Sequence, residues 1–199
     1  MTSSTRTTPL PDTSFGLLGL LTFGQELSGY DMVKAVEGSL GFFWAPAKSQ
    51  IYSELKRLKE VGFISEREVA QASRPDKRVY TMTPAGKEAF DDWLRQGDAV
   101  AEEVRSIFLL KLFYGHEMSD DEVRTKVLEF RAQAQESLES YTAIESTIAE
   151  HGGPDAPYQF YPYLTLTYGL AHARAGIEWA DEVLARLDAR EKSRKGGKR

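Results

Sequence analysis

Two stretches in the C-terminal half of the chain repeat an apolar or small residue in alternating steps of four and three. The first seam runs through Val123, Val127, Phe130, Ala134, Ser137, Tyr141, Ile144 and Ile148. The second runs through Tyr163, Leu166, Leu170, Ala173, Ile177, Ala180, Leu184 and Leu187. This period is typical of helices packed as in coiled coils, and the intervening HGGPDAP has the composition of a turn. The pattern predicts a helical hairpin whose helices are each on the order of 25 to 30 residues long.

The same seams leave more apolar surface than a single hairpin can cover. Leu128, Leu138, Trp179 and Val183 lie outside both seams. Apolar surface of this extent is typical of an interface, and a second copy of the chain is the simplest partner. The sequence therefore predicts a homodimer whose interface includes Val127, Phe130, Leu166, Leu170, Ile177, Trp179 and Leu184.

The N-terminal half predicts three short helices after a leader. Residues 1–13 are rich in Thr, Ser and Pro, and we expect them to be disordered. The nearly apolar segment 14–24 predicts a buried helix. Ser28, followed by a carboxylate three residues later, predicts the N-cap of a second helix. A third helix is expected over 47–60, with Gly62 at its C-terminal end.

A β-hairpin and a fourth helix are expected next. Residues 63–69 and 77–83 flank the polar turn AQASRPD, and Thr83-Pro84 has the pattern of an N-cap followed by proline at the first helical position. The predicted order is therefore three helices, a two-stranded hairpin and a fourth helix. This is the order of elements in a winged helix-turn-helix. The predicted fold is therefore mainly α with a small β-hairpin. It would comprise a DNA-binding winged helix-turn-helix at 14–97, a helical dimerisation and effector domain at 98–190, and a basic flexible tail at 191–199.

Three fragments of the N-terminal half carry a more specific signal. SGYDMVKAV, SQIYSELKRLKEVGFI and KRVYTMTPAGKEAF, in this order and spacing, resemble the PadR family of bacterial transcriptional regulators over about residues 14–95. Residues 105–188 are similar, more loosely, to the helical, virulence-activator-like C-terminal domain of longer PadR-like proteins, in RSIFLLKLFYG and GIEWADEVLARL. The resemblance implies a DNA-binding transcriptional repressor that a small-molecule effector releases.

The predicted helix 47–60 has a polar face that core packing does not explain. Ile51, Leu55 and Leu58 share one side of the helix, and small hydroxyl side chains, a tyrosine and cations occupy the rest. On an arbitrary helix such a face is solvated surface. In a winged helix, small hydrogen-bonding residues approach base edges and cations bind the flanking phosphates. We predict that this helix contacts DNA through Lys48, Ser49, Gln50, Tyr52, Ser53, Lys56 and Arg57.

Three further cations lie at or beside the tip of the predicted hairpin. They are Arg74, Lys77 and Arg78, with Asp76 as the opposing charge. A charged turn usually serves only solubility. The hairpin of a winged helix, however, lies beside the DNA backbone or reaches the minor groove. We therefore predict that these cations contact phosphates.

Charge is divided unevenly along the chain. The whole chain carries a formal charge of −5, but residues 46–80 hold eight Lys/Arg against five Asp/Glu, a local +3. Residues 116–150 hold three against nine, a local −6. This asymmetry indicates two modules with different partners.

The sequence gives no support for catalysis, a metal centre, a cofactor or a membrane span. Cysteine is absent, which excludes disulfides and thiolate sites, and the three histidines are scattered without metal-binding spacing. The longest apolar run, residues 15–23, is too short to cross a bilayer, and its leader does not have the pattern of a signal peptide. We expect a cytoplasmic protein that is not an enzyme.

Aromatic residues gather near the start of the last predicted helix: Tyr158, Phe160, Tyr161, Tyr163 and Tyr168. Such residues more often form a core or a dimer interface than a ligand site. Several proteins of the resembled family bind small aromatic compounds between their two domains. The resemblance therefore keeps a small aromatic effector as an alternative interpretation.

Two classes of function fit these features. In the first, a dimeric regulator binds a palindromic operator, because two recognition helices related by a dyad require an inverted repeat. In the second, the winged helix docks a protein partner without specific DNA binding, and the acidic half is the working surface. The basic N-terminal half favours the first.

Overall fold

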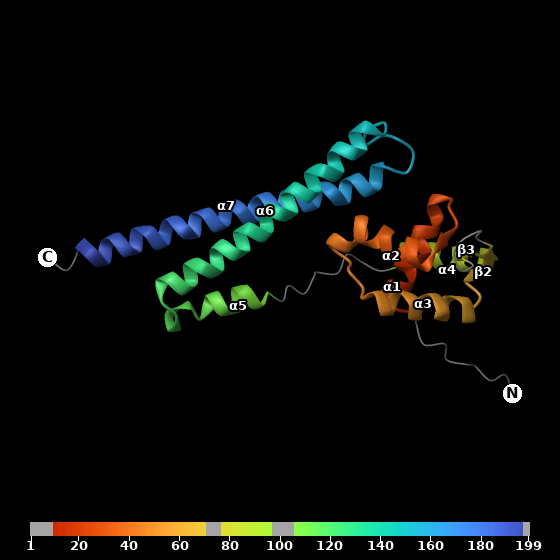
Figure 1. Ribbon diagram of the computed structural model, residues 1–199, viewed down its shortest axis with the longest axis horizontal. Helices are drawn as coiled ribbons and strands as arrows, with labels where there is room; N and C mark the ends of the chain where they lie inside the picture. The colour runs from red at the N-terminus through yellow and green to blue at the C-terminus, as the bar shows by residue number, and fades with distance from the viewer. Residues whose placement is uncertain (1–9, 71–76, 97–105, 197–199) are drawn as a thin grey trace. The chain divides into compact units, whose positions relative to one another are not determined.

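A computed structural model describes residues 10–70, 77–96 and 106–196. The chain divides into two compact units, Met1–Ala101 and Glu102–Arg199. Each unit is described by itself below, with the helix and strand labels of Figure 1.

The first unit is a winged helix-turn-helix with a three-stranded antiparallel sheet in the order β1-β3-β2. Two-residue β1 pairs with β3 and was not predicted from the sequence, because so short a strand has no detectable alternation. The β2–β3 hairpin was predicted, and it aligns Ile64 with Met82 and Val69 with Lys77. The elements are α1 (Asp12–Leu20), η1 (Leu21–Phe23), β1 (Leu27–Ser28), α2 (Gly29–Gly38), η2 (Leu40–Phe42), α3 (Lys48–Glu60), β2 (Ile64–Val69), β3 (Lys77–Met82) and α4 (Pro84–Arg95).

The core of this unit lies where α1, α2 and α3 meet. Its fully buried side chains come from the apolar side of each helix, and Phe90 of α4 joins them. Burial of these side chains is the main source of stability for a unit of this size. The largest fully buried hydrophobic residues are Leu17, Leu18, Met32, Ile51, Leu55 and Leu58.

The first helix corrects the predicted disorder of residues 1–13. Helix α1 begins at Asp12, Leu10 packs against the core, and Thr13 and Ser14 are buried. Pro11 is the N-cap in extended geometry, and the Asp12 carboxylate lies in the first turn, where the helix dipole favours negative charge. Residues 1–9 lie outside the described residues.

Close contacts fix the C-terminal end of α3 and the start of α4. Gly62 takes a φ of +78°, and Gly62 N–H and Phe63 N–H donate to the carbonyls of Lys59 and Leu58, which ends α3 in a Schellman motif. At the start of α4, Thr83 Oγ1 accepts from the N–H of Gly86. A Cβ at Gly86 would lie 2.1 Å from the carbonyl oxygen of Phe63, so this joint requires glycine.

The second unit is a long helical hairpin preceded by a short helix. It comprises α5 (Ile107–Phe113), η3 (Gly115–Glu117), α6 (Asp120–Glu150) and α7 (Phe160–Gly196). Helices α6 and α7 lie side by side (Figure 1). Val123 and Val127 of α6 pack with Ala180, and Ile148 packs with Leu166 and Leu170. The predicted seams therefore face each other within one chain.

The last helix extends further than the sequence indicated. A flexible tail was predicted from residue 191, but α7 continues to Gly196. Arg190 and Arg194 lie 3.6 Å and 2.9 Å from the carboxylate of Asp120 at the start of α6. These contacts hold the end of α7 against the first turn of α6. Residues 197–199 lie outside the described residues.

Candidate nucleic-acid interface

Helix α3 separates an apolar from a polar face as its sequence predicted. Ile51, Leu55 and Leu58 are at most 1% exposed. The seven side chains proposed from the sequence to contact DNA are exposed. They carry hydroxyl, amide and cationic groups, and the first of them belongs to the first residue of the helix. They are Lys48, Ser49, Gln50, Tyr52, Ser53, Lys56 and Arg57.

Tyr52 also packs against the neighbouring helix, which the sequence did not reveal. Its ring lies over the first turn of α2, where a Cβ at Gly29 would be 2.5 Å from Tyr52 Cε1. The side chain is still 52% exposed. Tyr52 therefore joins α3 to α2 while presenting part of its ring on the surface, so its removal would affect packing as well as any contact with DNA.

The cations of α3 lie near carboxylates of the same unit. Lys48 Nζ is 3.1 Å from Glu37, Lys56 Nζ is 3.8 Å from Glu60, and Arg57 Nη1 is 3.7 Å from Glu54. Hydrogen bonds from Lys34 and Lys48 lower the pKa of Glu37. Exposed ion pairs of this kind are weak, so a phosphate can compete for the ammonium groups.

If α3 contacts DNA, Glu54 and Glu60 should turn away from the phosphates, because a carboxylate that faced them would lower the affinity. Glu54 does so, because its side chain is 6% exposed and its carboxylate accepts a 2.5 Å hydrogen bond from the hydroxyl of Ser14. The Glu60 side chain is 63% exposed near the end of α3. With the Glu54 carboxylate buried, Lys48 is the one exposed charged side chain in the first two turns of α3, and Lys56 and Arg57 follow in the third.

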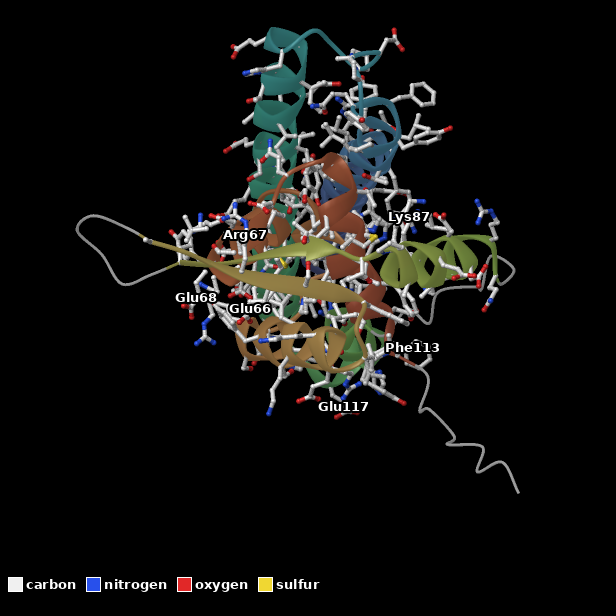
Figure 2. The ribbon with its side chains drawn as sticks, turned by 90° about the vertical axis from the view of Figure 1, so that its right-hand side faces the viewer. Glu66, Arg67, Glu68, Lys87, Phe113 and Glu117 are labelled. Carbon is white, nitrogen blue, oxygen red and sulfur yellow. The ribbon has the colours of Figure 1, made fainter. Side chains whose placement is uncertain are left out.

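The β2–β3 hairpin carries ionic side chains on both faces. Arg67 lies on one side of the strands and Glu66 and Glu68 on the other (Figure 2), as the period of two requires. Arg67 binds the carboxylate of Glu26, and Glu66 accepts a 3.0 Å hydrogen bond from Lys59 of α3. These pairs attach β2 to the rest of the unit.

The predicted wing cations differ in how firmly they are held. Lys77 Nζ is 2.8 Å from the carboxylate of Asp31, in the capping box of α2. Hydrogen bonds from Lys77 and from Ser28 hold the pKa of Asp31 below its usual value, against the opposing effect of burial. Arg78 lies 3.6 Å from Glu68, and both side chains are 63% exposed. Arg74 lies outside the described residues.

The structure corrects part of the predicted dimer interface. Val127, Leu166 and Leu170 are 0%, 8% and 3% exposed within a single chain, so they form the core of the hairpin. These three seam residues were also assigned to the dimer interface, but the packing of α6 against α7 already covers them. Ile177 and Leu184 are partly exposed and remain predicted interface residues.

Phe130 and Trp179 lie in an aromatic cluster with Phe108 of α5. Phe108 stacks on Phe130 with ring centroids 4.8 Å apart, and Trp179 meets both rings edge-on. The sequence did not predict this role for α5. Trp179 was assigned to the surface left for a partner, but much of its ring is covered within one chain.

A recess of about 200 Å³ opens beside this cluster, between α5 and α6. Aromatic rings form part of its wall, and two ammonium groups, a carboxylate and an amide also line it. The lining residues are Ile107, Phe108, Lys111, Lys126, Glu129, Phe130 and Gln133. The recess therefore offers apolar surface, two ammonium groups and one carboxylate.

Exposed apolar side chains gather on two parts of the second unit. One part is α5 with the neighbouring turn of α6, where Ile107 is 69% and Phe113 79% exposed (Figure 2 labels Phe113). The other comprises the turn before α7 and the first residues of that helix, where Tyr158 and Tyr161 are 71% and 76% exposed. Surfaces of this kind mark interfaces. The run IFLLKLF was the sequence signal for the first of them.

Among the described residues, no cluster of three or more His, Cys, Asp or Glu side chains is arranged to hold a metal ion. The same residues contain no helix that is long and apolar enough to cross a membrane.

The fold of the first unit, with a polar and cationic third helix beside a β-hairpin, is that of a winged helix-turn-helix DNA-binding protein. The profile described as "Transcriptional regulator PadR-like family" matches residues 17–92. The profile "Virulence activator alpha C-term" matches residues 104–188. Together the two profiles account for both units.

Characterised relatives match along nearly their whole length. The negative transcriptional regulator PadR of Bacillus subtilis is 33% identical over 87% of this chain and 96% of its own. The structure of that protein in complex with operator DNA is similar with a TM-score of 0.79, at 30% identity over 89% of this chain and 99% of the other. Its structure in complex with p-coumaric acid gives a TM-score of 0.73, at 31% identity over the same shares. The chain belongs to the PadR family of transcriptional regulators.

Proposed function

We propose that this chain is a transcriptional repressor that binds operator DNA as a dimer and is released by a small aromatic effector. The observation that carries the proposal is the exposed polar and cationic face of α3 beside the β2–β3 wing. The PadR protein of Bacillus subtilis is named a negative regulator, and its structures with operator DNA and with p-coumaric acid support both parts of the proposal. Its place of action would be the cytoplasm.

The first half of α3 enters the major groove in this proposal. Ser49, Gln50 and Ser53 are small enough to reach base edges, and Tyr52 lies against the groove wall. Lys48, Lys56 and Arg57 would exchange their carboxylate partners for phosphates. On the wing, Arg78 is the more available cation, since Lys77 is held at Asp31. Arg74 remains a proposed phosphate contact.

The second unit supplies the dimer. Exposed apolar side chains on α5 and at the start of α7, together with Ile177 and Leu184, would be covered by a second copy. Two-fold symmetry then requires an inverted repeat, with half-sites about 10 or 20 base pairs apart. The recess between α5 and α6 is the proposed site of the effector, because its rings and its lysines suit an aromatic acid.

The experiment is an electrophoretic mobility shift with the DNA immediately upstream of the chain's own gene, followed by footprinting. We expect a protected inverted repeat, and p-coumaric acid or a related aromatic acid should release the DNA. A scrambled fragment of equal length and composition is the control. Equal affinity for both fragments at moderate salt would refute sequence-specific binding and leave the protein-docking alternative.

A further inference from the structure

Three consecutive residues in the first turn of α1 each hold a different side chain of the first unit. Asp12 accepts a 3.0 Å hydrogen bond from Trp93 Nε1 of α4. Thr13 Oγ1 accepts from Gln50 Nε2 of α3 at 3.3 Å. The Ser14 hydroxyl donates to Glu54 of α3 at 2.5 Å. This turn is therefore a point where α4 and the recognition helix are tied together.

The two contacts to α3 are spaced by one helical turn. Gln50 and Glu54 are one helical turn apart on the part of α3 that lies against α1, but Glu54 is buried whereas Gln50 remains exposed. Thr13 and Ser14 are 5% and 0% exposed, so their hydroxyl groups are removed from water and need partners within the protein. The partners are polar side chains of α3, which means that α1 sets where these two side chains point.

Gln50 is the side chain whose direction matters for reading DNA. A glutamine recognises adenine with its amide oxygen and nitrogen together, in one plane. The bond to Thr13 uses one N–H of the amide and leaves Oε1 and the second N–H for a base. A free glutamine would lose rotamer entropy on binding, and a glutamine already held by Thr13 loses less.

We propose that Thr13 is a specificity-determining residue, which acts by holding the amide of the exposed Gln50 side chain in one orientation for base recognition. This inference rests on the proposed function, because it presumes that the first half of α3 reads the operator. Thr13 would not touch the DNA itself; it is a positioning residue that acts through Gln50.

Thr13 is a better subject for a test than Ser14. The Ser14 hydroxyl donates a hydrogen bond to the buried carboxylate of Glu54. Without this hydroxyl, the buried carboxylate would lose that hydrogen bond, which destabilises the fold. Loss of affinity in Ser14→Ala could then reflect unfolding. Thr13→Val keeps the β-branched shape and removes only the hydroxyl, and Thr13→Ser keeps the hydroxyl and removes the methyl group.

The test measures the affinity of the full-length protein for the footprinted operator and for a set of operators with one base pair changed at a time. Gln50→Ala first identifies the base pair at which discrimination depends on Gln50, with an expected loss of about fivefold or more. Thr13→Val should lose about threefold of the discrimination at that same base pair and keep it elsewhere. Thr13→Ser should keep the discrimination of the parent. Melting temperatures of both Thr13 variants are recorded in parallel.

The outcomes separate this inference from the proposed function. If Thr13→Val discriminates as the parent does, or if Thr13→Ser loses as much as Thr13→Val, the positioning role is overturned. If Gln50→Ala changes discrimination at no base pair, the role is also overturned, although the parent still binds its operator. If the parent itself prefers no sequence, the proposed function fails first.

Discussion

Lys56 and Lys59 offer a matched pair for testing the DNA-binding face of α3. Both are lysines of the same helix, and each replacement by alanine removes one positive charge. Lys56 is 79% exposed in its side chain, and its neighbour Glu60 is 3.8 Å away. Lys59 instead donates a 3.0 Å hydrogen bond to Glu66 of β2 and lowers the pKa of that carboxyl group. Only Lys56 belongs to the proposed DNA-contacting set.

The size of the effect follows from counterion release. One phosphate contact contributes about 0.9 to the slope of log affinity against log salt. At 0.1 M salt the loss of one contact therefore costs roughly eightfold in affinity. The proposed dimer presents α3 twice, so Lys56→Ala should lower the slope by about 1.8 and the affinity by about 60-fold, or roughly 2.4 kcal/mol.

The assay is operator titration at four or five salt concentrations, with thermal melts of each variant alongside. We expect Lys59→Ala to keep the slope of the parent, and both variants to melt close to it, since exposed ion pairs contribute less than about 1 kcal/mol. Equal slopes for Lys56→Ala and the parent would show that the polar face of α3 does not meet phosphates. If both variants lost the same amount of operator affinity, the effect would be explained by the change in net charge and not by a contact of Lys56 with a phosphate.

Three further predictions concern the fold, pH and assembly. Gly86→Ala should lower the free energy of unfolding by about 3 kcal/mol in denaturant titration, because the new Cβ would meet the Phe63 carbonyl, and an unchanged midpoint would contradict this. Asp31→Asn should cost about 1 kcal/mol at pH 7 through the loss of its capping and Lys77 contacts. The folded pKa of Asp31 is lowered, so its contribution to stability is complete above the unfolded pKa, about 3.9, and is lost as pH falls through the folded pKa. A gap between variant and parent that does not narrow as the pH falls below the unfolded pKa would be inconsistent with that origin. A chain that ends at Gln96 should be a folded monomer by light scattering with most of its operator affinity lost, and a truncated chain that still dimerises would place the interface in the first unit.

Much of this fold follows from local sequence signals. Ser28 and Thr83 were predicted as N-caps and Gly62 as a helix end, because capping chemistry involves neighbours within a few residues. The seams of α6 and α7 were equally readable, since each is a period within one helix. The period predicted the hairpin, but it did not show which seam residues the hairpin would bury completely. Val127 was also assigned to the dimer interface, yet it is 0% exposed within its own chain, and only the three-dimensional arrangement reveals this.

The candidate site was predicted as a set of residue types, and its long-range contacts were not. The exposed face of α3 follows from its helical period. The contact of Tyr52 with Gly29 and the bond of Thr13 with Gln50 join residues far apart in the sequence. For Thr13 the composition led to a wrong prediction. A Thr- and Pro-rich segment is typical of a disordered leader, and the sequence does not show that the Thr13 hydroxyl has a hydrogen-bond partner in α3.

Helix α4 is fastened at both ends. At its start, Thr83 donates from its N–H to the Phe63 carbonyl at 3.0 Å and from its hydroxyl to the Gly62 carbonyl at 2.7 Å, just past the end of α3. Near its other end, Trp93 donates to Asp12. Because α4 is held at both ends, we expect it to move as one rigid body with the rest of the first unit. An effector should then change the spacing between the two winged helix-turn-helix units of a dimer and leave the structure of each unit unaltered.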